Sequence, residues 1–248
     1  MVSRLTLLLL LSALLWPRPA RALSVEPNPV LVDTFFHGLT LHVRGPAEPG
    51  AEICVTIAGQ SAQEKFNRKG RFGPLWANVG SVTFAGAPRL FFVACSAPVR
   101  QIFDDVTAQR ELLDLDALVA RTSLSPAGAD AASLRREYLR LKQSEGVLGE
   151  LVGAVRKTGA GATAAFDVAI PWPDKAPAGE YTVRVLYVRD RAIVREERAK
   201  LEARLVGVPR LVATLAFEHG ALYGLVAVVA ALALGLVIGL VFKRGGGH

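Results

Sequence analysis

Hydrophobic and polar residues alternate along residues 23–99, and Gly and Pro interrupt the alternation at short intervals. A period of two residues is typical of strands that bury one face. The pattern predicts strands at 39–43, 53–57, 75–84 and 90–95. In the second strand Ile53, Val55 and Ile57 form the expected inward face, with Glu52 and Thr56 on the solvent side. The apolar run at 90–94 favours a central position in a sheet.

The pattern changes to helical spacing in the middle of the chain. Residues 99–119 carry apolar residues at helical intervals, with Asp104 and Asp105 near the expected start. After a loop near residue 126, Asp130 is expected to cap a second helix that ends near Gly146. Residues 149–162 are small and glycine-rich, which predicts a loop.

Strand patterns return after this helical part, at 166–170, at 181–187 and from Ile193 onward. The Gly179-x-Tyr181 start is similar to the tyrosine corner of immunoglobulin-like sandwiches, where the phenol hydroxyl bonds to the upstream backbone. With about seven predicted strands, the fold class is mainly β. We expect an immunoglobulin-like β-sandwich over residues 23–206, with an α-helical insertion at about 99–146.

The N-terminal residues have the order of a secretory signal peptide, which we place at 1–22. Arg4 precedes a charge-free apolar run at 5–16, and Pro17, Pro19 and the small residues around Arg21 follow. At about 1.5 Å per residue the run covers only about 18 Å of the roughly 30 Å hydrocarbon core. It is therefore too short to remain as a comfortable membrane span.

Residues 220–242 contain no charged side chain and reach about 34 Å as a helix, which predicts a C-terminal transmembrane helix. Residues 207–219 before it have the spacing of a juxtamembrane amphipathic helix. Lys243 and Arg244 follow the apolar run, and the positive-inside rule assigns residues 243–248 to a cytoplasmic tail. The chain is thus expected to be single-pass, with its N-terminal domain exported.

The charge balance argues against a nucleic-acid partner. The chain has 29 basic and 22 acidic residues. Three arginines lie in the signal peptide and two cations lie in the tail, which leaves 24 basic against 22 acidic residues in the exported part. Between Arg184 and Arg204 basic residues alternate with Asp190, Glu196 and Glu197, which favours ion pairs on a solvated sheet edge over a surface for anionic lipid or an acidic partner.

Motifs for catalysis and cofactor binding are absent from the sequence, including a nucleophile elbow, a P-loop, a dinucleotide fingerprint and CxxC. His37 and His42 would lie on opposite faces of a strand, and His219 and His248 flank the membrane helix. We therefore expect no enzyme activity, no cofactor and no metal site.

Two features suggest covalent or helix-mediated contacts. Cys54 and Cys95 would be exported, where a disulfide is chemically permitted, although their spacing does not decide whether the Cα atoms lie within bonding distance. Small residues recur every four positions on one face of the membrane helix, which favours close packing on itself or on a multi-pass protein. These residues are Ala227, Ala231, Gly235 and Gly239.

The ordered segments of the chain resemble the transmembrane protein family named for alphaproteobacteria (Alph_Pro_TM), whose members are uncharacterised. The resemblance lies in Trp76-x-Asn78 with residues 81–84, in Leu141-Lys142-Gln143 and in Phe217-x-His219. It implies a periplasmic domain tethered to the bacterial inner membrane. Some members accompany sulfite-exporter-type permeases. No functional residue follows from the resemblance.

These observations lead to two functional hypotheses. The first is a membrane-anchored periplasmic interaction module, accessory to an inner-membrane transporter or envelope complex. The second is a small-molecule-binding or enzymatic periplasmic domain, with its site among the helical insertion and the loops at Trp76 and Trp172. The lipid bilayer is a partner under either hypothesis.

Overall fold

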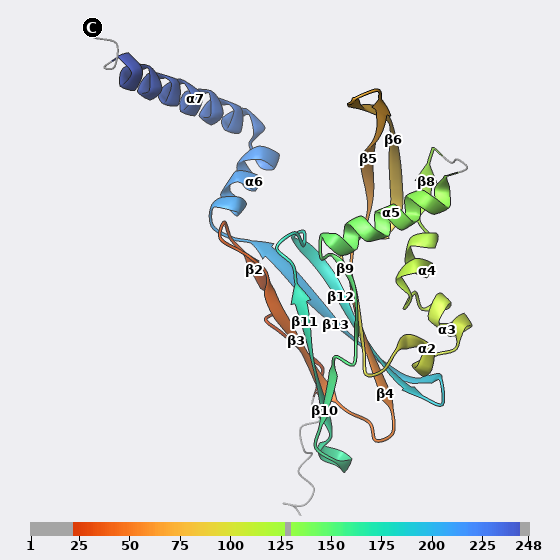
Figure 1. The fold of residues 1–248 in the computed structure, drawn as a ribbon. Coiled ribbons are helices and arrows are strands. Elements are labelled where there is room, and N and C mark those ends of the chain that lie inside the picture. Colours follow the sequence, from red (N-terminus) through yellow and green to blue (C-terminus); the bar gives the residue numbers. More distant parts are fainter. Residues whose placement is uncertain (1–21, 127–129, 244–248) are drawn as a thin grey trace, which may run out of the picture. The chain divides into compact units, whose positions relative to one another are not determined.

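The structure is a computed structural model that describes residues 22–126 and 130–243. The predicted signal peptide falls almost entirely outside the described residues, and so does the tail after Lys243. The fold is mainly β, with one long apolar helix near the C-terminus (Figure 1). The chain divides into two compact units, and His37–Ala203 makes up most of the first. The second contains Leu31–Phe36 and the chain from Arg204 onward.

The strands form three sheets (Figure 1). The first has the order β1-β3-β11-β10, and the second has the order β2-β13-β12-β4-β7-β9. A third and smaller sheet has the order β5-β6-β8. The strand bounds are β1 Ser24–Glu26, β2 Val30–Val32, β3 Leu39–Pro46, β4 Glu52–Gly59, β5 Ser61–Phe72, β6 Leu75–Pro88, β7 Phe91–Cys95, β8 Ser123–Ser125, β9 Leu148–Val152, β10 Val155–Thr158, β11 Ala165–Trp172, β12 Gly179–Arg189 and β13 Ala192–Leu205.

The first two sheets pack against each other through aromatic side chains. Trp172 of β11 meets Tyr181 of β12 edge to face, with ring centroids 4.6 Å apart. Phe166 and Tyr187 repeat this contact at 6.3 Å, and the Tyr187 hydroxyl donates to the Pro46 carbonyl at 3.0 Å. These rings are almost fully buried, and such pairs add about 1 kcal/mol each beyond their burial. The aromatic contacts therefore fix how the two sheets meet.

A second core lies on the other face of the six-stranded sheet, under short helices. The helices of this part are α2 Val99–Ile102, α3 Asp105–Arg110, α4 Leu115–Ala120 and α5 Ala131–Ser144. Cys54 and Val93 from the sheet and Phe103, Leu113 and Tyr138 from the helical part belong to one buried cluster. The sheet is thus covered on both faces. This explains why nearly all residues of β4 and β7 are buried.

The placement of Thr56 on the solvent side was wrong, because only 3% of this residue is exposed. Ile53, Val55 and Ile57 are fully buried as expected. The other face of β4 is buried as well, since Cys54 and Ala58 on either side of Thr56 contact the cluster beneath the helices. A strand that is central in a sheet covered on both faces loses its polar side.

Three further predictions need correction. Residues 99–119 form α2, α3 and α4 rather than one helix, because Asp104 and Asp114 cap new helices and Leu112 has a positive φ of 57°. Residues 149–162 are not simply a loop, because β9 and β10 pair there with β7 and β11. β6 continues to Pro88, through the expected turn at 86–88.

The long strand β12 and its neighbour behave as the charge pattern predicts. Asp190 and Arg191 have positive φ angles and turn the chain from β12 into β13. Arg184 bonds Glu196 at 2.9 Å across the two strands, and Arg195 bonds Glu48 at 3.3 Å. The expected ion pairs are therefore confirmed.

The second unit contains two helices, α6 Val208–Glu218 and α7 Gly220–Lys243. The stretch Gly220–Leu240 is long and apolar enough to cross a membrane, and none of its most apolar window is buried within the protein. Tyr223 lies in the first turn of α7, where an interfacial aromatic residue is common.

Candidate functional site

The β5–β6 hairpin extends well beyond its contacts with the rest of its unit. β8 pairs with β6 only at Thr83–Ala85, and the two strands continue as a ribbon to a turn at Gly73 and Pro74. Gly73 has a φ of 60°, a conformation that glycine adopts without strain. Figure 1 shows the end of the hairpin passing beyond α5.

Large hydrophobic side chains are exposed on this outer part of the hairpin. Leu75 is 70% exposed, Trp76 is 68% exposed and Val79 is 48% exposed. They do not contribute to a core, and Trp is strongly favoured at the centres of protein interfaces. Leu75 and Trp76 are successive residues of β6, so their side chains point to opposite faces of the ribbon.

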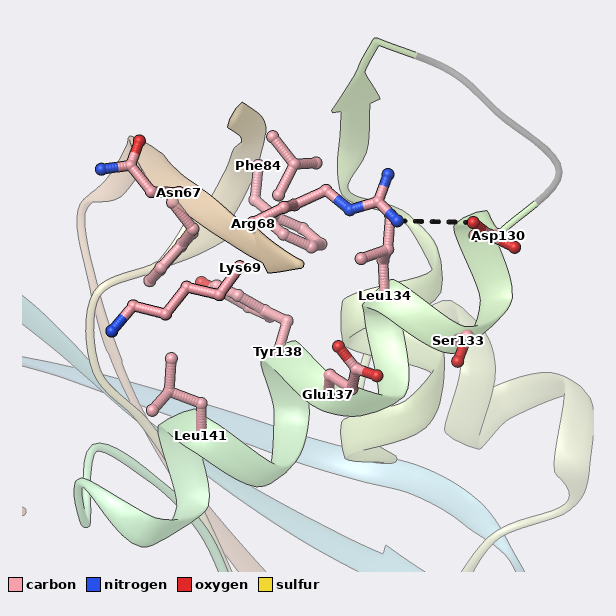
Figure 2. A pocket seen from close by; sticks show the side chains of 12 residues that line it. Asn67, Arg68, Lys69, Phe84, Asp130, Ser133, Leu134, Glu137, Tyr138 and Leu141 are labelled. Carbon is pink, nitrogen blue, oxygen red and sulfur yellow. Dashed lines mark ion pairs between the residues drawn. The ribbon is translucent and has the colours of Figure 1, made fainter. Parts of the chain in front are cut away.

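A groove of about 450 Å³ lies between β5 and α5, and we call it the β5–α5 groove (Figure 2). Its volume lies within the range of about 300–1,000 Å³ typical of ligand sites. Its lining from α5 recurs every three or four residues, so one face of the helix forms one wall. The lining residues are Phe66, Asn67, Arg68, Lys69, Val82, Phe84, Asp130, Ser133, Leu134, Glu137, Tyr138 and Leu141.

Three aromatic rings form the floor of the groove. Phe84 stacks on Tyr138 with centroids 4.4 Å apart, and Phe66 meets both rings edge to face at 5.9 and 5.8 Å. Phe84 and Tyr138 are nearly fully buried. The floor is therefore apolar and closely packed, and Leu141 borders it.

A buried lysine ties β5 to α5 beside this floor. The Lys142 Nζ lies 2.8 Å from a carboxylate oxygen of Glu64 and 3.2 Å from one of Glu145. It also lies 5.7 Å from the ring centroids of Phe66 and Tyr138, within cation–π range. The Tyr138 hydroxyl donates to Glu64 at 3.4 Å, and burial, the Glu64 charge and this hydrogen bond raise the pKa of Tyr138. These contacts hold the two walls of the groove together.

Positive charge is concentrated around the groove. β5 carries four basic residues against Glu64, and α5 carries four against Glu137, so each element has a net charge of +3. Arg68 pairs with Asp130 at 3.5 Å at one end of the groove (Figure 2). Within the described residues, six of these eight cations form no ion pair: Lys65, Lys69, Arg71, Arg135, Arg136 and Arg140. Residues 23–242 carry 24 basic and 22 acidic residues, and the fold separates this nearly balanced charge into regions.

Of the residues singled out in the sequence, Asp130, Leu141 and two residues of the 81–84 segment line this groove, whereas the tryptophans and His42 do not. Trp76 lies at the hairpin end, and Trp172 is buried between the two larger sheets. His42 pairs with Asp167 at 3.1 Å. Among the described residues no group of three or more His, Cys, Asp or Glu side chains could hold a metal ion.

Cys54 and Cys95 are Cα partners on the neighbouring strands β4 and β7, 4.1 Å apart, and their sulfur atoms are joined. They connect strands of one sheet rather than two sheets. On α7, nothing in the structure lies near a side chain added at Gly235 or Gly239, so the small-residue face is open.

The model of the family described as "Putative transmembrane protein (Alph_Pro_TM)" matches residues 22–244 of this chain. The chain belongs to this family. The resemblance seen in the sequence is therefore confirmed, and Alph_Pro_TM membership agrees with a helix able to span a membrane. No curated protein and no solved structure matches the chain. Membership in Alph_Pro_TM assigns neither an activity nor a partner.

Proposed function

We propose that this Alph_Pro_TM protein is a membrane-anchored interaction module that binds a partner protein through the β5–β6 hairpin and its surroundings. The partner is an inner-membrane transporter or another envelope complex, to which this chain is accessory. The observation that carries the proposal is the exposure of Leu75, Trp76 and Val79 on a ribbon outside the core. Burying such side chains in a partner is worth about 1.5–3 kcal/mol each.

The proposed topology is a cleaved signal peptide, a periplasmic domain and a cytoplasmic tail in the bacterial inner membrane. Lys243 and Arg244 after the apolar helix support this orientation. The face of Ala227, Ala231, Gly235 and Gly239 is proposed to pack on a second copy or on a multi-pass partner. Crosslinking in membranes should weaken for Gly235→Ile, and unchanged crosslinking would count against this face.

We also propose that the two larger sheets form an immunoglobulin-like sandwich. The Tyr181 hydroxyl donates to the Pro177 carbonyl four residues upstream, which is the bond of a tyrosine corner. The helical part and the β5–β6 hairpin are then additions to this sandwich. Additions to a common fold often carry the specific function.

A binding role is proposed in preference to catalysis. Catalytic groups work in sets, with a nucleophile, a base and a stabilising donor within hydrogen-bond reach of each other. The charged groups at the β5–α5 groove are instead spread along its two walls or engaged in ion pairs. This distribution suits recognition of a surface better than reaction at one atom.

Affinity capture of the full chain in mild detergent tests this function. We expect a partner to co-purify with the wild type and to be lost with Trp76→Ser. Truncating one central interface tryptophan removes about 2 kcal/mol or more, which lowers affinity more than about 30-fold.

Val106→Ser provides the matched control, because Val106 is 74% exposed on α3 and lies away from the hairpin. Retention of the partner by Val106→Ser is the expected result. Equal capture by the wild type and Trp76→Ser, or no capture by either, would overturn the hairpin as the binding element.

A further inference from the structure

We infer that the membrane surface covers two apolar parts of the second unit, the exposed face of α6 and the turn at Phe35. The occupant of both is lipid, at the boundary of headgroups and acyl chains beside the start of α7. Both surfaces belong to the second unit, whereas the β5–β6 hairpin belongs to the first. The bilayer contact is therefore an addition to the proposed function, and it depends on α7 rather than on a partner protein.

α6 presents an apolar face that the described part of the protein leaves open. Its apolar residues Val208, Leu211, Val212 and Leu215 recur at the spacing of one helix face, and no residue of α6 is buried. Val208 is 61% exposed, Leu211 is 59% exposed and Val212 is 45% exposed. An amphipathic helix with such a face can lie in the plane of the membrane surface and bury that face below the headgroups.

α6 is attached directly to the helix that is able to span the membrane. His219 alone separates α6 from α7 (Figure 1). Its φ of −131° and ψ of 52° interrupt the helix, so α6 can lie at an angle to α7. The 11 residues of α6 cover about 16 Å. An upright α6 would leave Val208 in water, about 16 Å from the start of α7, whereas a helix along the surface buries its whole apolar face.

A turn far away in the sequence belongs to the same unit as α6. The Val206 N–H donates to the Val32 carbonyl at 2.9 Å, which holds the turn beside the start of α6. The Phe35 N–H donates to the Asp33 carboxylate at 2.9 Å and closes the turn. Leu31 is 54% exposed and Phe35 is 80% exposed. The second unit therefore has a further exposed apolar surface next to α6.

This turn reaches the bilayer when α6 lies along the membrane surface. Phe35 is three residues beyond Val32, a distance of at most about 11 Å along the chain. An exposed phenylalanine beside an interfacial helix can enter the same boundary of headgroups and acyl chains. Residues 31–36 and 204–219 together carry two basic and two acidic residues, so the contact is apolar and does not need anionic lipid.

Nitroxide spin labels on introduced cysteines test this contact in the full chain, reconstituted in phosphatidylcholine vesicles. Phe35→Cys, Val208→Cys and Leu211→Cys each carry one label, and Val106→Cys is the matched control, because Val106 is 74% exposed on α3. Oxygen concentrates in lipid, whereas a charged nickel complex stays in water. Labels at 35, 208 and 211 should collide more often with oxygen than with the nickel complex. The control label should show the reverse, and so should a label at Arg210 on the opposite face of α6.

Three results would overturn this bilayer contact. A label at 35 or 208 that collides mainly with the nickel complex would show that its surface faces water. Slow collision with both reagents would show that a second copy or another protein covers the site. Collision with oxygen that rises only when phosphatidylglycerol is added would show a contact through charge. Capture of a partner through Trp76 is measured separately, so the proposed function can survive each of these results.

Discussion

Lys142→Met tests whether the ion pairs beside the groove hold the hairpin against α5. Methionine keeps the apolar stem of the side chain and removes its charge. The variant loses hydrogen bonds to Glu64 and Glu145, and both carboxylates remain partly screened, with 24% and 30% of the side chains exposed. Discounted for this exposure, each bond is worth about 1 kcal/mol, and the two cation–π contacts add about 0.5 kcal/mol each at most.

The expected loss is therefore about 2–3 kcal/mol in the docking of β5 on α5. Hydrogen exchange by mass spectrometry should show β5 and α5 amides exchanging roughly 30- to 150-fold faster, with little change in β11 and β12. Lys65→Met is the matched control, because Lys65 lies on the same strand and is exposed without an ion pair. Equal exchange in the wild type and Lys142→Met would refute the reasoning.

Further predictions concern the six-stranded sheet, through its disulfide and through Tyr181 of β12. Cys54 and Cys95 should resist alkylation until the protein is reduced, and free thiols in protein from native membranes would contradict this. Replacing both by alanine should lower the free energy of unfolding, measured by urea denaturation, by up to roughly 4 kcal/mol, because the disulfide joins residues separated by 41 positions. Burial raises the pKa of Tyr181 to about 12 from an ordinary 10, so its stabilising contribution is full below pH 10 and is lost as the pH rises toward 12. Tyr181→Phe should remove this part of the alkaline decline, and an unchanged pH profile of unfolding would contradict the assignment.

Sequence patterns predicted the strands whose two faces differ. β3, β11 and β12 alternate clearly, and the tyrosine bond at Tyr181 has a local signal in Gly179-x-Tyr181. β9 and β10 were missed because glycines and exposed polar residues dilute their alternation, and pairing with β7 and β11 decides their conformation. Tertiary contacts outweigh weak local preferences in such strands.

The α5 wall of the groove lies in the helical insertion, where the second hypothesis placed a site, but its β5 wall had no signal in the sequence. β5 is rich in charged residues and carries few apolar ones, so it does not resemble a strand with a buried face. The pairing of Glu64 with Lys142 joins residues 78 positions apart. The charge counted over residues 23–242 also hid the concentration of basic residues on β5 and α5, because that concentration depends on the fold bringing these elements together. The resemblance to Alph_Pro_TM could be recognised from the sequence because it lies in short motifs that follow one another along the chain.

Photo-crosslinking in cells tests the central claim most directly, because it asks whether a partner occupies the groove in the native membrane. A photoreactive amino acid is placed at Ser133, on the α5 wall of the groove, and in a separate variant at Arg156 on β10. The account predicts one discrete adduct from position 133 and none from position 156. No adduct from position 133, or the same adducts from both positions, would contradict it.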